Sequence, residues 1–114
     1  VGGLRDASMD AALLLGCSTD LDPAVAVLSQ RQVPLIGVEA RDRDGMHRVE
    51  LDNREGMRRG AEHLHALGHR CVGVITLPMD RAHTRGPLTA EWEAASEAYT
   101  ALERLAGVRE VYPD

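Results

Sequence analysis

Three histidines lie close together in the stretch EHLHALGH, and they are the first candidates for chemistry because neutral imidazole is a common zinc ligand. On a predicted helix, His63 and His65 are two positions apart and therefore point about 200° away from each other. His69 follows a glycine that is expected to end that helix. The zinc-protease pattern H-E-x-x-H is absent, because the glutamate precedes the first histidine. The spacing therefore predicts solvent-exposed histidines and no metal site.

The sequence has no pattern typical of nucleophilic or cofactor-dependent catalysis. No serine occupies a G-x-S-x-G turn, and Cys17 and Cys71 have no neighbouring base. Both cysteines lie in or beside apolar runs, which predicts buried, reduced thiols, with a disulfide as the alternative. The two glycines near the N-terminus are not followed by the rest of a phosphate-binding loop. We therefore expect no enzyme activity and no cofactor.

Two charged residues are better candidates for a binding site. Glu39 follows the apolar run VPLIGV, and ligands of parallel α/β sheets bind beyond the carboxyl ends of the strands. A carboxylate there accepts two hydroxyl hydrogen bonds, which suits a sugar or another polyol; the alternative is a glutamate that is simply solvated at a strand end. Arg104 lies between Leu102 and Leu105 on a predicted helix, where the simplest interpretation is a surface arginine with a packed aliphatic stem.

The elements that position these residues must come from a chain of 114 residues, the size of one small domain. Hydrophobic residues make up 44% of it and aromatic residues only 3%, so the core is expected to be aliphatic, which suits sheets covered by helices. The net charge of −5 and the lack of a basic stripe argue against direct nucleic-acid binding. The sequence has neither a long apolar run nor a charged-then-apolar leader, which predicts no membrane span and no secretion signal.

The hydrophobic pattern predicts an α/β fold with parallel sheet layers. Fully buried strands are expected at 11–16, 33–40 and 71–78, and a short alternating run follows at 47–52. A helix between the first two strands is expected to be capped by Asp22, which completes a βαβ unit.

Two further helices are predicted by their capping residues. Asp52 or Asn53 can cap the first, and Gly68 is expected to end it in a left-handed conformation. Thr89 can cap the second, which follows a breaker-rich loop at 79–88. Each helix carries an apolar stripe at helical spacing. The stripes consist of Met57, Ala61, Leu64 and Leu67 in the first helix, and of Trp92, Ala95, Tyr99, Leu102 and Ala106 in the second.

The segments VPLIGVE, RVELDNREGMRRGAEHLHALGHRCVGVITLP and ALERLAGVR together resemble the effector-binding domain of the lactose-repressor (LacI/GalR) family of bacterial transcription regulators. That family has a V-P-x-x-x-x-D strand, then V-x-x-D-N, a G-x-x-x-A-x-x-H-L-x-x-L-G-H helix, a strand ending in Gly-Pro, and an R-x-x-G-[FW] helix. The matching residues here are Leu51, Asp52, Asn53, Gly56, Gly60, Ala61, His63, Leu64, Leu67, Gly68, His69, Pro78, Arg104 and Gly107.

The resemblance implies a periplasmic-binding-protein-like fold of two Rossmann-like subdomains, with a sugar or another small metabolite held between them. On that mapping, residues 1–51 are the later part of the N-terminal subdomain and residues 52–114 are the first part of the C-terminal subdomain. Glu39 corresponds to an Asp that faces the ligand in many family members, and Arg104 to an arginine that contacts the effector. The segment 81–98 corresponds to an insertion.

The resemblance further implies a fragment of a cytoplasmic, homodimeric repressor-type regulator. In such a protein the effector shifts the orientation of the two subdomains, and operator DNA is bound only through a helix-turn-helix head outside this chain. The alternative is the sugar-binding protein of a transport system, which shares the fold. A fragment of this kind is expected to expose apolar sheet faces and to associate with itself or with the missing part.

Overall fold

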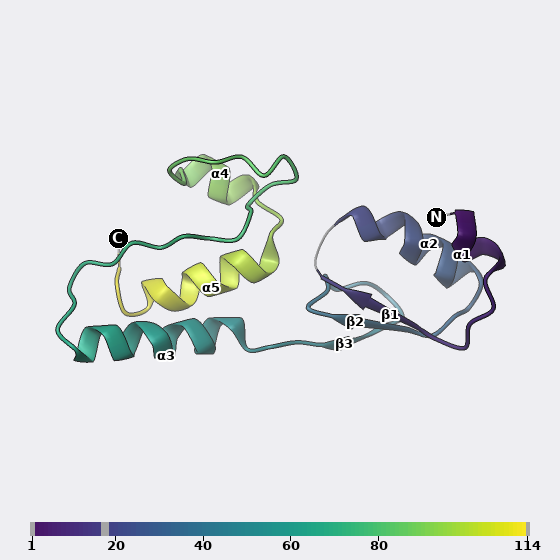
Figure 1. Ribbon diagram of the computed structural model, residues 1–114, viewed down its shortest axis with the longest axis horizontal. Coiled ribbons are helices and arrows are strands. Elements are labelled where there is room, and N and C mark those ends of the chain that lie inside the picture. The colour runs from purple at the N-terminus through teal and green to yellow at the C-terminus, as the bar shows by residue number, and fades with distance from the viewer. Residues whose placement is uncertain (1, 17–18, 114) are drawn as a thin grey trace. The chain divides into compact units, whose positions relative to one another are not determined.

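The computed structural model describes residues 2–16 and 19–113, and it divides into two compact units, Val1–Leu51 and Asp52–Asp114 (Figure 1). The prediction for Cys17 falls outside the described residues.

The first unit is built on a parallel sheet, as the hydrophobic pattern predicts. Its strands are β1 (Ala12–Leu15), β2 (Leu35–Val38) and β3 (Met46–Val49), in the order β1-β2-β3, with Leu35 paired to Ala12 on one side and to Met46 on the other. The helical elements of this unit are α1 (Gly2–Asp6), η1 (Thr19–Leu21) and α2 (Asp22–Gln30). This arrangement confirms the α/β fold class.

Helix α2 begins one residue earlier than a cap at Asp22 requires. Leu21 occupies the N-cap position without a side-chain hydrogen bond, and Asp22 lies in the first helical turn, where its negative charge favours the positive end of the helix dipole. The Asp22 carboxylate instead accepts a hydrogen bond from Nε of Arg43 at 3.0 Å. The predicted helix is therefore correct, but the predicted cap is wrong.

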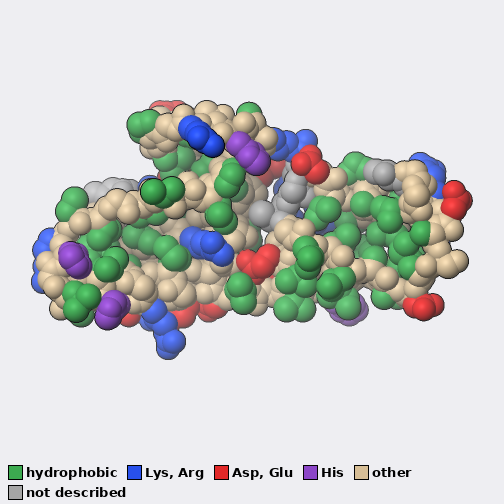
Figure 2. Space-filling model, viewed as in Figure 1, with side chains coloured by type: hydrophobic (Ala, Val, Ile, Leu, Met, Phe, Trp, Pro, Cys, Tyr) green, Lys and Arg blue, Asp and Glu red, His purple; other side chains and the backbone are tan. Residues whose placement is uncertain are grey.

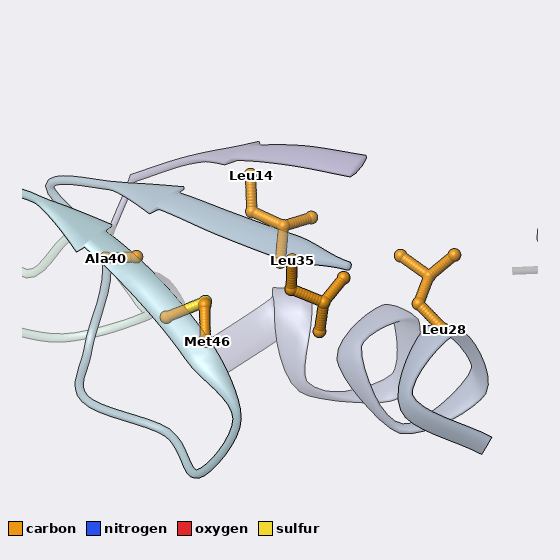
Figure 3. Close-up of a cluster of buried hydrophobic side chains, with 5 residues drawn as sticks. All are labelled: Leu14, Leu28, Leu35, Ala40 and Met46. Carbon is orange, nitrogen blue, oxygen red and sulfur yellow. The ribbon is translucent and has the colours of Figure 1, made fainter. Parts of the chain in front are cut away.

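The core of the first unit lies on one face of the sheet. It contains the buried side chains Leu14, Leu28, Leu35, Ala40 and Met46, which come from the strands, from α2 and from the residue that follows Glu39 (Figure 3). The alternating side chains point the other way, and Leu13 and Leu15 are 61% and 68% exposed. The prediction of fully buried strands is wrong, because α2 packs on one face and the described residues of this unit provide no layer for the other.

The second unit is helical. It contains α3 (Asn53–Ala66), α4 (Ala90–Ala95) and α5 (Tyr99–Arg109). The side chain of Asp52 accepts a hydrogen bond from the backbone N–H of Glu55 at 3.0 Å, and Gly68 has a φ of +95° just beyond the helix. The predicted start and end of α3 are therefore confirmed, and both follow from local chemistry.

The predicted strand at 71–78 does not form, because in this unit the described residues contain no second strand with which it can pair. Backbone N–H and C=O groups of an extended segment need a ladder partner or water, and here they face solvent. Ile75 and Cys71 are exposed, so the prediction of a buried Cys71 thiol is also wrong. Figure 2 shows hydrophobic side chains on the surface of each unit.

The predicted final helix is interrupted. Thr89 caps α4 as expected, since its Oγ1 accepts a hydrogen bond from the backbone N–H of Trp92 at 3.2 Å. Ser96 then adopts an extended conformation, donates from Oγ to the carbonyl of Met79 at 2.6 Å and accepts from the N–H of Ala98 at 3.2 Å. These contacts end α4, and α5 starts three residues later at Tyr99.

Helices α3 and α5 lie side by side and pack closely (Figure 1). Gly107 is buried at this contact, where a Cβ atom would overlap the carbonyl oxygen of Arg54 and lie 3.0 Å from the backbone nitrogen of Arg58. Gly107 therefore sets the distance between α3 and α5.

A separate buried cluster of Met79, Ala101 and Leu105 packs α5 against the segment that precedes α4.

No helix in the described ranges is long and apolar enough to cross a membrane.

Candidate functional site

Arg104 is held by a buried polar residue at the start of α3. Its Nε donates a hydrogen bond to Oδ1 of Asn53 at 2.8 Å, and Asn53 is only 9% exposed. Arg104 is half-buried, as a surface arginine with a packed stem would be, and the hydrogen bond to Asn53 additionally holds its guanidinium. Among the described residues, its two terminal nitrogens form no hydrogen bond with protein atoms. The guanidinium is therefore anchored at one edge and offers its other donors to a ligand.

The helix pair explains the position of this arginine. Arg104 and Gly107 are three residues apart on α5, so they share one face of the helix. Gly107 lies against the α3 backbone, and the same face therefore brings Arg104 to Asn53, the first residue of α3. The spacing R-x-x-G thus combines a donor group with a close helix contact. Sequence reasoning placed Arg104 on a helix but missed Asn53 as its partner.

Charged residues surround the start of α3. Glu55 accepts hydrogen bonds from Nε of Arg58 at 2.7 Å and from Nε of Arg59 at 3.0 Å. The hydrogen bond from Arg58, together with the charges of both arginines, lowers the pKa of Glu55 to about 2. Arg54 pairs with Glu110 at 2.5 Å, which links α3 to the end of α5 and raises the pKa of Arg54. These ion pairs stay at the surface, where they are screened by water and salt.

Glu39 follows β2 directly and has a φ of +53°. Its backbone N–H donates to the carbonyl of Val49 at 2.9 Å, and its Oε1 accepts from the backbone N–H of Leu51 at 2.5 Å. Glu39 is half-buried, and its carboxylate makes this local backbone contact at the surface of the unit. The carboxylate thereby connects the end of β2 to the chain after β3. Neither the left-handed backbone nor the Leu51 contact has a signal in the sequence.

Glu39 belongs to the first unit and Arg104 to the second. The structure therefore provides two separate candidate groups, a carboxylate at a strand end and a guanidinium at a helix pair.

The three histidines of the stretch EHLHALGH are exposed, as predicted. His63 and His65 lie on α3, and His69 follows Gly68. The ring of His65 packs edge-on against Tyr112, with 5.8 Å between the ring centroids, and the Tyr112 hydroxyl donates to the carbonyl of His69 at 2.9 Å. Within the described ranges, no group of three His, Cys, Asp or Glu side chains could hold a metal ion. This region serves to attach the C-terminal segment to α3.

A separate cavity of about 490 Å³ lies in the second unit, between residues 74–79, the loop 83–88 and Trp92. Most of its lining belongs to the segment that was predicted as a strand and to the loop that follows it. Neither Glu39 nor Arg104 lines this cavity. It therefore forms no part of the two candidate groups.

No family model matches the sequence. The chain is 34% identical over 108 residues to an HTH-type transcriptional regulator of Mycolicibacterium smegmatis, covering 90% of the chain and 29% of that protein. It is 31% identical over 120 residues to an HTH-type transcriptional regulator of Mycobacterium tuberculosis, covering 96% of the chain and 33% of that protein.

The fold also matches a solved structure. The crystal structure of a LacI-family transcriptional regulator from Corynebacterium glutamicum superimposes with a TM-score of 0.79 at 25% identity, over 95% of this chain and 32% of that one. The chain thus spans about a third of the length of the proteins it matches.

Proposed function

We propose that the chain, which is similar to HTH-type transcriptional regulators and to a LacI-family regulator of known structure, is part of a LacI-type regulator and lies in the region in which such a protein binds a small-molecule effector. Residues 1–51 then form the later part of the N-terminal subdomain, and residues 52–114 form the first part of the C-terminal subdomain. The observation that carries the proposal is the guanidinium of the half-buried Arg104, which is anchored at Nε on Asn53.

A guanidinium in this state suits a ligand rich in oxygen. Arginine carries donors and no acceptor, so its partners must offer lone pairs, as hydroxyl, carboxylate and phosphate groups do. The side chain has already lost much of its rotamer freedom through the contact with Asn53, so less conformational entropy is lost when a ligand binds. We assign the effector to the sugars or related polyols.

Glu39 supplies the complementary group in this proposal. An ionised carboxylate has about four lone-pair positions, and the N–H of Leu51 uses one of them. A sugar hydroxyl is a donor as well as an acceptor, so Glu39 would accept hydrogen bonds from the ligand while Arg104 donates to it. A glutamate places its carboxylate one methylene further from the backbone than the family's aspartate does, so the bound sugar is expected to differ from those of relatives that carry aspartate.

The same proposal assigns a regulatory role to the complete protein. Effector binding would shift the orientation of two subdomains and so change the affinity for operator DNA, which residues outside this chain would contact. The regulator would act in the cytoplasm as a homodimeric repressor, and the proposal assigns no catalytic step, metal or cofactor to the chain.

The test uses the complete natural polypeptide. Thermal unfolding is followed with D-glucose, D-galactose, D-ribose and D-glucitol, each added singly at a concentration far above its expected dissociation constant. A ligand at a hundred times its dissociation constant stabilises the folded state by about 2.7 kcal/mol, so a binding sugar raises the midpoint by several degrees. The sugar that binds is then expected to change operator affinity. An unchanged midpoint with all four compounds would contradict the assignment to sugars and polyols.

A further inference from the structure

The contact between Arg104 and Asn53 also decides which donors of the guanidinium are left. Arginine has five N–H donors in a rigid plane, and they form two kinds of edge. One edge pairs Nε with a terminal nitrogen, and the other pairs the two terminal nitrogens. Because Nε is bonded to Oδ1 of Asn53 at 2.8 Å, the first edge cannot hold a ligand bidentately. The edge formed by Nη1 and Nη2 keeps both of its donors for a ligand.

Asn53 is well placed to impose this orientation. It is the first residue of α3, directly after the capping residue Asp52, and it is buried. The close approach of α3 and α5 at Gly107 fixes the distance between the two helix backbones. A buried acceptor on a capped helix therefore meets a donor on a helix packed against it, and neither backbone can shift without moving the other.

Because the amide of Asn53 is neutral, it does not offset the positive charge of the Arg104 guanidinium. An aspartate at this position would form an ion pair with Arg104 and offset much of its charge. An asparagine accepts the same hydrogen bond and leaves the full positive charge of the guanidinium for the remaining donors. The side chain thus orients the arginine without neutralising it.

From these observations we propose that Asn53 is a positioning residue, which fixes Arg104 so that Nη1 and Nη2 together hold two neighbouring oxygen atoms of the effector. The chemical class that fits is a ligand with two adjacent oxygen acceptors, such as the vicinal hydroxyls of a sugar ring. This inference rests on the proposed function, because it names the recognition chemistry of the same arginine.

A double-mutant cycle in the complete natural polypeptide tests the inference. The affinity for the tightest-binding sugar of the four named above is measured for the wild type, Asn53→Leu, Arg104→Ala and the double variant. Asn53→Leu keeps the size of the side chain but removes the acceptor, and it should weaken binding about tenfold. If Asn53 acts through Arg104, the same substitution has almost no further effect in the Arg104→Ala background. Independent, additive losses would overturn the inference.

Rescue by Asn53→Asp separates positioning from general damage to the fold. This variant restores the acceptor that positions Arg104 but offsets part of the guanidinium charge, so sugar affinity should recover from the loss in Asn53→Leu to within about threefold of the wild type. A readout that needs no ligand is the NMR signal of the Arg104 Nε–H group, which should be protected from solvent exchange in the wild type and in Asn53→Asp but not in Asn53→Leu. Equal protection in all three proteins would overturn the inference.

The failure of the inference and that of the proposed function are distinguishable. If none of the four compounds binds the wild type, the proposed function fails, and the proposed role of Asn53 in effector recognition fails with it. If a sugar binds the wild type and Asn53→Leu equally well, only the inference about Asn53 fails, and Arg104 remains the proposed contact.

Discussion

Gly107 on α5 lies directly against the backbone of Arg54 on α3. A Cβ atom at position 107 would overlap the Arg54 carbonyl oxygen and approach the Arg58 nitrogen to 3.0 Å, and both of these atoms belong to a helix backbone that cannot move independently. The contact joins the two longest helices of the second unit and places Arg104 opposite Asn53. Both the stability of the helix pair and the position of Arg104 therefore depend on the absence of a Cβ atom at Gly107.

Gly107→Ala should destabilise the protein by about 3 kcal/mol. The free-energy cost of relieving the overlap is expected to exceed the roughly 1 kcal/mol by which alanine is more favourable than glycine within a helix. Gly56→Ala is the matched control, since a Cβ atom there meets nothing within 4 Å, and it should leave stability unchanged or raise it by up to about 1 kcal/mol. Chemical denaturation of both variants measures the difference. Equal midpoints for the two alanine variants would show that the helices can separate without cost.

Glu55 predicts a specific dependence of stability on pH. Its pKa is lowered to about 2 in the folded protein from the ordinary value of 4.5, mainly by the hydrogen bond from Arg58. A depressed carboxyl pKa contributes stability above the unfolded value, and this contribution is lost as the pH falls from about 4.5 toward about 2. The midpoint of thermal unfolding should therefore fall less steeply over this range in Glu55→Gln than in the wild type. Superimposable pH profiles would rule out a contribution from this carboxylate.

Arg104→Ala should weaken the binding of an effector sugar by at least about tenfold, since a hydrogen bond to a charged group contributes about 1.5–3 kcal/mol. Operator affinity in the absence of effector should remain within about twofold of the wild-type value. Arg59→Ala is the control, because Arg59 is 76% exposed and forms a surface ion pair on the neighbouring helix. Isothermal titration gives the sugar affinity of all three proteins. Similar losses in Arg59→Ala and Arg104→Ala would argue against a specific contact.

Glu39 is expected to stabilise the fold through the Leu51 N–H and to contact the effector, and two substitutions can distinguish these roles. Glu39→Gln keeps an oxygen that can accept from the N–H of Leu51, whereas Glu39→Ala loses it. Sugar binding should weaken in both variants, but only Glu39→Ala should also lose about 1–2 kcal/mol of stability. Titration calorimetry and thermal unfolding measure the two effects. Full sugar affinity in Glu39→Gln would mean that the carboxylate charge does not contact the effector.

Local chemistry predicted several elements of the fold correctly. Asp52, Gly68 and Thr89 each act within a few residues of their position in the chain, so their residue types indicate where helices start or end. The segment 71–78 was wrongly predicted as a strand, and the break at Ser96 in the predicted final helix was missed, because both depend on partners distant in the sequence. A strand needs a neighbouring strand, and Ser96 ends α4 by bonding the carbonyl of Met79, which lies 17 residues earlier.

The candidate site was predictable to a similar extent. Its two charged residues could be selected from strand-end position and family resemblance, but their partners could not. Asn53 and Arg104 are 51 positions apart, and the left-handed backbone of Glu39 is rare for a residue with a side chain. Contacts of this kind become visible only once the helices and strands are placed.

The sheet of the first unit has one packed side, and Leu13, Leu15 and Val49 are exposed among the alternating residues of its strands. This unit is amphipathic, because one face of its sheet is packed and the other exposes apolar side chains. Residues 1–51 prepared alone would therefore adsorb at air–water interfaces and bind fluorescent hydrophobic dyes. Purification of this piece would then call for mild surfactant and low concentration, whereas a longer stretch of the same polypeptide that covered this side of the sheet would not.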